Sequence, residues 1–80
     1  MNSSHKRPYA IYQIRVQGEL DRNWEGYFSN LAIKLTHTGD LPITILTGPV
    51  IDQSALRGLL CKLWDLNLIL ISVRQLKADR

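Results

Sequence analysis

The chain has 80 residues, of which 45% are hydrophobic and 21% are charged, and its formal net charge is +3. A chain of this length forms one domain, and it contains neither the roughly 20 consecutive apolar residues of a membrane span nor the apolar core of a signal peptide. Its single cysteine, Cys61, excludes an internal disulfide and a Cys/His zinc site, which favours a soluble protein in a reducing cytoplasm.

The two ends of the chain differ in composition from its middle. Residues 1–8 are polar and end in proline, and they predict a disordered basic tail before a single domain over residues 9–76. Between Pro8 and Leu76 six bases balance six acids, so the positive excess comes from the two ends. We expect residues 77–80 to form a C-terminal tail and both tails mainly to aid solubility.

The first half of the domain predicts a strand and a short helix. Residues 9–20 alternate apolar and polar side chains with a period of two, as a strand with one buried face requires. Apolar residues then recur at the i, i+3, i+4 and i+7 positions of a helix, namely Trp24, Tyr27, Phe28 and Leu31. We therefore expect a helix over residues 21–30 that is capped by Asp21 or Asn23, weakened by Gly26, and packed through its aromatic stripe into the core.

A β-hairpin is predicted next. Residues 31–37 again alternate with a period of two, and the β-branched residues 43–47 give a third strand. Residues 38–42, between them, contain Gly39 and a proline and predict a turn. His37 stands at the end of the second strand, and we expect it to be a surface or structural residue because no second catalytic or ligating group is close in sequence.

An amphipathic helix and a last strand complete the domain. Residues 52–66 gather their apolar side chains on one side of a helical projection, and Asp52 is placed to cap the helix. Asn67 stands where a left-handed residue ends a helix, and residues 68–75 predict the fourth strand.

The glycine before the second helix raises the question of a phosphate site. A phosphate-binding turn needs several free backbone N–H groups at the start of a helix, often with a lysine. Here Pro49 lacks an N–H group, no lysine follows, and the Asp52 carboxylate would repel an anion. We therefore interpret Gly48 and Pro49 as a structural turn.

The order of elements is β-α-β-β-α-β, which predicts an α+β fold of the ferredoxin-like plait type. Right-handed crossovers and short links then give a four-stranded antiparallel sheet of order 4-1-3-2. Both helices are expected on one face of the sheet, and the other face is left uncovered by the chain itself.

Two motifs and a closing segment resemble a family of small uncharacterised bacterial proteins. They read Trp24-x-x-Tyr27-Phe28-x-Asn30-Leu31-x-Ile33, then Leu46-Thr47-Gly48-Pro49-Val50-x-Asp52-Gln53-x-x-Leu56-x-x-Leu59-Leu60, then Leu70-x-Ser72-Val73. The resemblance covers about residues 9–75. Family members favour glycine where this chain has Asn30 and Asn67, and asparagine is the best substitute for glycine in a left-handed conformation. The resemblance implies the fold and a bacterial source, and it carries no activity and no binding residue.

The uncovered face of the predicted sheet is the candidate interaction surface. The residues that we expect to form an interface there are Ile11, Thr44, Leu46, Leu68 and Leu70. A short chain gains from shared burial, and twofold dimers are the commonest oligomers. The sequence thus predicts a non-enzymatic interaction or regulatory module, a homodimer rather than a receptor for a second protein, with no cofactor or metal. Its likeness in topology to ACT-type regulatory domains is an analogy of fold alone.

Nucleic-acid binding is the alternative function. Basic residues of the N-terminal tail and of the uncovered face would then contact phosphates, namely Lys6, Arg7, Arg15, Lys34 and Arg74. The predicted face has no aromatic platform for base stacking unless Tyr9 reaches its rim, which disfavours this alternative. A small enzyme is the third hypothesis, but the sequence has no evident acid–base or nucleophile pair, and no basic pair activates Cys61.

Overall fold

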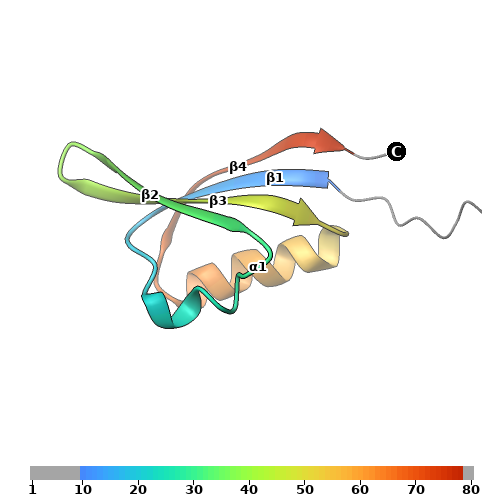
Figure 1. Cartoon of the computed structure of the whole chain (residues 1–80), viewed down its shortest axis with the longest axis horizontal. Helices are drawn as coiled ribbons and strands as arrows, with labels where there is room; N and C mark the ends of the chain where they lie inside the picture. Colours follow the sequence, from blue (N-terminus) through green and yellow to red (C-terminus); the bar gives the residue numbers. More distant parts are fainter. Residues whose placement is uncertain (1–9, 79–80) are drawn as a thin grey trace, which may run out of the picture.

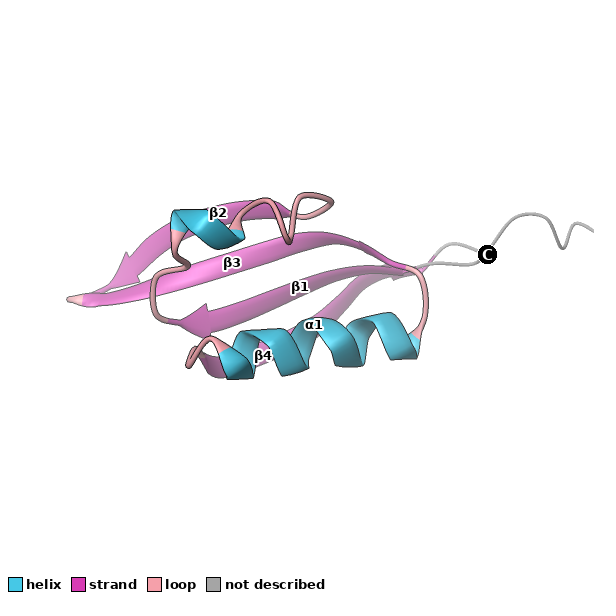
Figure 2. Ribbon diagram, turned by 90° about the horizontal axis from the view of Figure 1, so that it is seen from below, coloured by secondary structure: helices cyan, strands magenta, loops and turns pink. Residues whose placement is uncertain are grey.

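The computed structural model of the protein describes residues 10–78, which form one four-stranded antiparallel sheet with helices on one side (Figure 1). The strands are β1 (Ala10–Gln17), β2 (Ala32–Thr38), β3 (Leu41–Val50) and β4 (Ile69–Ala78). A 3₁₀ helix, η2 (Arg22–Trp24), and an α-helix, α1 (Gln53–Asp65), lie on the same side of the sheet (Figure 2). The strand order β2-β3-β1-β4 is the predicted order read from the opposite edge.

The predicted first α-helix does not form, so the expectation of a plait with two helices is wrong. Residues 22–31, called the turn segment below, begin with η2 and continue as hydrogen-bonded turns. Backbone N–H groups in this segment donate hydrogen bonds to carbonyls three residues earlier, which is 3₁₀ geometry. The first of these bonds joins Trp24 to Asp21 (2.9 Å) and the last joins Leu31 to Phe28 (2.9 Å). Gly26 lowers helix propensity at the centre, and so short a stretch is a marginal α-helix in any case. The fold is α+β with one α-helix within residues 10–78.

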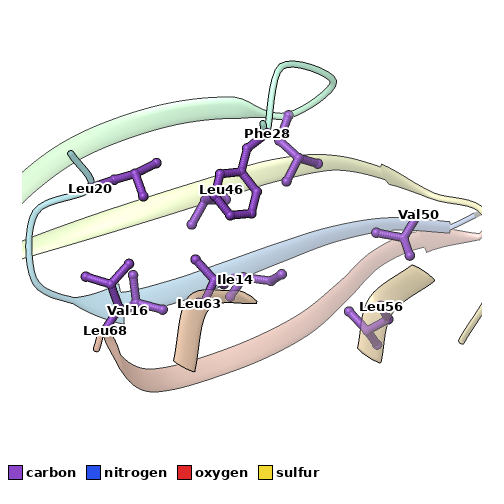
Figure 3. Packing of buried hydrophobic residues seen from close by; sticks show 10 residues of the cluster. Ile14, Val16, Leu20, Phe28, Leu46, Val50, Leu56, Leu63 and Leu68 are labelled. Carbon is purple, nitrogen blue, oxygen red and sulfur yellow. The ribbon is translucent and has the colours of Figure 1, made fainter. Parts of the chain in front are cut away.

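The turn segment and α1 share one core against the covered face of the sheet. Its buried side chains come from the strands, the turn segment and α1, and Figure 3 shows Ile14, Val16, Leu46, Phe28, Leu56 and Leu63 among them. Phe28 has no exposed surface, which confirms its predicted core position. Tyr27 is 55% exposed and Trp24 is half-buried, so the aromatic stripe belongs to the core only in part.

Both ends of α1 are closed as the sequence predicts. The Asp52 carboxylate accepts a hydrogen bond from the Ala55 N–H group (2.8 Å) and so caps the first turn. At the other end Asn67 has a φ of 68°, the predicted left-handed conformation. Its N–H group donates to the Trp64 carbonyl (2.9 Å) and that of Leu68 donates to Leu63 (3.1 Å), which together form a Schellman motif.

Gly48 and Pro49 lie inside β3, so their interpretation as a turn is wrong. β3 continues to Val50, and the chain turns only at residues 51–52. A Cβ atom on Gly48 would lie 2.7 Å from a Leu31 side-chain carbon and 2.9 Å from the Asn30 carbonyl oxygen. Glycine is therefore required because the end of the turn segment rests directly on β3.

The last strand is longer than predicted and irregular. β4 runs to Ala78, so Lys77 belongs to the strand and not to a tail. Its pairing with β1 shifts register twice, and the shifts leave Ile71 and Leu76 without a partner in β1. No helix within the described residues is long and apolar enough to cross a membrane.

Candidate functional site

The pairing of the strands decides which side chains occupy each face of the sheet. Paired residues of neighbouring strands point to the same side, and Ile14 pairs with Leu46 in β3 and with Val73 in β4. These residues face α1 and the turn segment. The opposite side, called the open face below, has neither element against it (Figure 1). Gln13 and Arg15 of β1 lie there, because successive residues of a strand alternate between faces.

Most of the predicted apolar interface is not on the open face, and this placement is wrong. Thr44 and Leu46 are each 1% exposed, and Leu68 is 7% exposed, within the core side of the molecule. Leu70 pairs with Val16 on the covered face. Of the five predicted residues, Ile11 alone lies on the open face, where it pairs with Pro49 and Lys77.

The error has a simple physical cause. Residues 43–47 carry apolar side chains at both odd and even positions, so alternation does not say which set is buried. The pairing of Ile14 with Leu46 settles the choice, and it sends Ile43 and Ile45 to the open face. Thr44 is buried as a polar residue because its hydroxyl donates a hydrogen bond to the Gly18 carbonyl (2.7 Å).

The open face carries the predicted basic residues instead. Arg15, Lys34 and Arg74 are all exposed there, as the sequence analysis expected. Lys77, which was assigned to the tail, joins them because it pairs with Ile11. The sequence offered little signal for Lys77, since the register shift at Leu76 interrupts the alternation of β4.

One row of paired residues crosses all four strands at the centre of this face. It consists of Lys34, Ile45, Arg15 and Ser72, from β2 to β4. The next row contains Thr47, Gln13 and Arg74. The hydroxyl of Ser72 is buried and has no hydrogen-bond partner among the described residues. Positive charges on the open face are thus interspersed with short polar groups and half-buried isoleucine.

Charge is segregated between the sheet and the rest of the molecule. The four strands contain four bases, Arg15, Lys34, Arg74 and Lys77, and no aspartate or glutamate. Of the six carboxylates of residues 10–78, five lie in loops and one in α1, and the three other bases of these residues lie in η2 and α1. The open face is therefore the basic surface of a domain that is close to neutral as a whole.

The open face has charge but no aromatic ring in its described strands. Tyr12 is the one aromatic residue of the four strands, and it lies on the covered face. Its hydroxyl accepts a hydrogen bond from the Gln53 amide (3.2 Å) and donates to Gln75 (3.4 Å). The face can therefore contact phosphates but cannot stack bases through these residues.

The remaining candidate residues are dispersed. His37 is exposed on β2 and Cys61 is exposed on α1. In residues 10–78 no three His, Cys, Asp or Glu side chains are grouped as metal ligands would be. Lys6 and Arg7, two of the predicted nucleic-acid contacts, lie outside the described residues.

Comparison with protein families gives one match, over residues 11–74, to a domain of unknown function (DUF8691). The chain belongs to this family. The match covers nearly all of the described domain, including every strand and α1 except the first residue of β1 and the last four of β4. Neither the curated proteins nor the solved structures contain a match to the chain.

Proposed function

We propose that the protein is a non-enzymatic binding module whose open face contacts the phosphate backbone of a nucleic acid. The observation that carries the proposal is the charge of the strands, which hold four bases and no carboxylate. Three of these bases lie in two adjacent rows, with Arg15 between Lys34 and Arg74.

The same face argues against the dimer that was predicted on it. Two copies joined through their open faces by a twofold axis would bring like charges together, which disfavours association. Leu46 and Leu68, two of the apolar residues predicted to form that interface, are buried in the core of each chain, and Ile45 and Ile69 are left beside the bases on the open face. A polyanion, in contrast, is attracted by all four bases.

The experiment is a salt titration of nucleic-acid binding. Fluorescence anisotropy of a labelled single-stranded oligonucleotide is measured at several KCl concentrations between about 20 and 200 mM. Contact with four phosphates predicts that log K falls with log [KCl] with a slope of about −3. Because the described face has no aromatic platform, oligonucleotides of different base composition should bind about equally.

Two charge variants test the assignment to the open face. Arg15→Gln removes the central base and should reduce the slope by about 0.7, the value for one phosphate contact. Arg57→Gln removes an exposed base from α1, on the other side of the molecule, and should change neither affinity nor slope. Equal losses from the two variants, or no binding at the lowest salt, would reject the proposal. A variant of Lys6 and Arg7 measures what the N-terminal residues add.

The exposed apolar residues of the edge strand β4 favour self-association through that strand. β4 is an edge strand, and Ile69, Ile71 and Leu76 on it are 59%, 51% and 47% exposed. Natural proteins usually avoid an apolar edge strand because its free N–H and C=O groups pair with other chains. We propose that a second copy pairs along β4, which would make the two open faces neighbours in one continuous sheet.

A further inference from the structure

A groove lies between α1 and the turn segment and extends to the end of the sheet where β3 leads into α1. It has a volume of about 780 Å³, within the range of small-molecule sites. Tyr27 and Asn30 form one wall, and Ala55, Gly58 and Leu59 form the other. Residues 49–51 and Ile11 border it where β3 leads into α1. Figure 2 shows the two walls as separate elements on the same side of the sheet.

Gly58 is the residue that the fold itself does not explain. It lies in the interior of α1, where glycine weakens a helix relative to alanine. Glycine inside a helix lets another group approach the backbone closely, because it has no Cβ atom. Yet apart from its chain neighbours and the backbone of its own helix, no atom of the described residues lies within 4 Å of the position that a Cβ atom on Gly58 would occupy. The space beside this glycine is open, and it belongs to the groove.

The opposite wall is held in place by contacts that do not fill the groove. The end of the turn segment rests on Gly48 of β3, and Phe28 anchors the segment in the core. The Tyr27 ring packs edge-to-face against Phe28, with ring centroids 4.8 Å apart, and yet the residue is 55% exposed. An exposed aromatic ring thus faces an open helix backbone across the groove, with both walls preorganised.

The chemistry of the lining indicates the kind of molecule that fits. Most of the lining residues are apolar, and the polar side chains among them are the Tyr27 phenol and the Asn30 amide. Among residues 10–78, no Asp, Glu, Lys, Arg or His lines the groove, although such residues are frequent on the surrounding surface. Burying a charged ligand against this lining would cost free energy because no opposite charge would compensate for its lost hydration, whereas a neutral apolar ligand has no such penalty. We propose that the groove binds a neutral, largely apolar small molecule that lies against Gly58.

The inference is separate from nucleic-acid binding because none of the four bases of the open face lines the groove, although Ile11 and Pro49 of that face border it. Its test uses Nile red, a neutral planar dye whose fluorescence rises in apolar surroundings, titrated into the full chain. Saturable binding at one site per chain is expected. Gly58→Leu places a side chain in the groove beside α1 and should weaken dye binding by at least about tenfold, while the helix keeps its fold because leucine is the better helix former.

Arg57→Leu is the matched control. It adds the same side chain to the neighbouring position of α1, which is exposed and does not line the groove. It should leave dye affinity unchanged, and circular dichroism should show native secondary structure for both variants. Absence of saturable binding, or equal affinity of the Gly58→Leu variant and the parent chain, would overturn the proposal. So would a parent dimer that Gly58→Leu converts to monomer, because the groove would then hold a second copy.

Discussion

The ammonium group of Lys62 in α1 lies 4.9 Å from the centroid of the Trp24 ring in the turn segment. It also lies 5.3 Å from the centroid of the Tyr27 ring, so one cation connects the two elements that cover the sheet. Lys62→Met should therefore lower the free energy of unfolding by about 0.5–1 kcal/mol, measured by urea denaturation. Lys62→Arg keeps the cation and should lose less. In a Trp24→Leu background, which lacks the indole ring, Lys62→Met should lower the free energy of unfolding by clearly less than it does in the parent chain. An equal loss in both backgrounds would mean that the contact between Lys62 and Trp24 does not stabilise the fold.

Phe28 and Tyr27 are neighbours with opposite environments, and their alanine variants should differ accordingly. Phe28 has no exposed surface, so Phe28→Ala should cost about 3–5 kcal/mol, enough to unfold a small domain. Tyr27 is 55% exposed, and Tyr27→Ala should leave a cooperative thermal transition. If the two variants melt at the same temperature, the turn segment is not anchored through Phe28.

Asn67 ends α1 with a φ of 68°, a conformation that disfavours side chains branched at Cβ. Asn67→Gly should be neutral or stabilising, and Asn67→Val should cost about 1 kcal/mol or more. The melting temperatures of the two variants, compared with the parent chain, give the result. A valine variant as stable as the parent would contradict the Schellman end of the helix.

Two glycines should respond to alanine in opposite directions. Gly48→Ala places a methyl group against the Asn30 carbonyl and should destabilise the domain by about 1–3 kcal/mol, because backbone cannot move aside cheaply. Gly58→Ala places the methyl group in open space within a helix and should stabilise by about 0.5–1 kcal/mol. Denaturant unfolding of both variants checks the signs, and a loss of stability in the second would mean that the space beside α1 is not open.

The proposed pairing of two chains along β4 predicts a defined oligomeric state. Size exclusion with light scattering should give twice the chain mass of 9.2 kDa. Ile71→Lys should give the monomer, because a charge on an edge strand opposes strand pairing. Ile51→Lys changes an isoleucine of similar exposure before α1 and should leave the dimer intact. A parent chain that elutes as a monomer at about 100 μM rejects this pairing.

The sequence predicted the strands and α1 well because their signals are local. Alternation from Tyr12 to Val16, the Asp52 cap and the left-handed Asn67 each depend on a few neighbouring residues. The helix over residues 21–30 failed because an apolar spacing of three and four is compatible with 3₁₀ turns as well as with an α-helix. Choosing between them depends on how closely the segment approaches Gly48, a contact far away in the chain.

The candidate surfaces were harder to predict than the strands. Arg15 and Lys34 were placed on the correct face because each alternates with apolar residues in its own strand. Arg74 was placed correctly because it follows Ser72 and Val73 in alternation, on the C-terminal side of the register shift at Ile71. Thr44 and Leu46 were misplaced because β3 has apolar residues at both odd and even positions, and only pairing with β1 decides its orientation. The groove beside Gly58 has no local signal, since its two walls come from elements about thirty residues apart.

The segregation of charge makes the domain an electric dipole, with its positive end on the strands and its negative end on the loops, because the loops hold five of the six carboxylates of residues 10–78. The field of a polyanion orients such a molecule during the encounter, so that the basic strands face the polyanion when the two meet. The association rate constant should therefore fall steeply as the salt concentration rises. The same dipole lets the acidic side of one molecule attract the basic side of the next. Such stacking is head-to-tail and does not close on itself, so at low ionic strength the protein should form open chains that dissolve when salt is added.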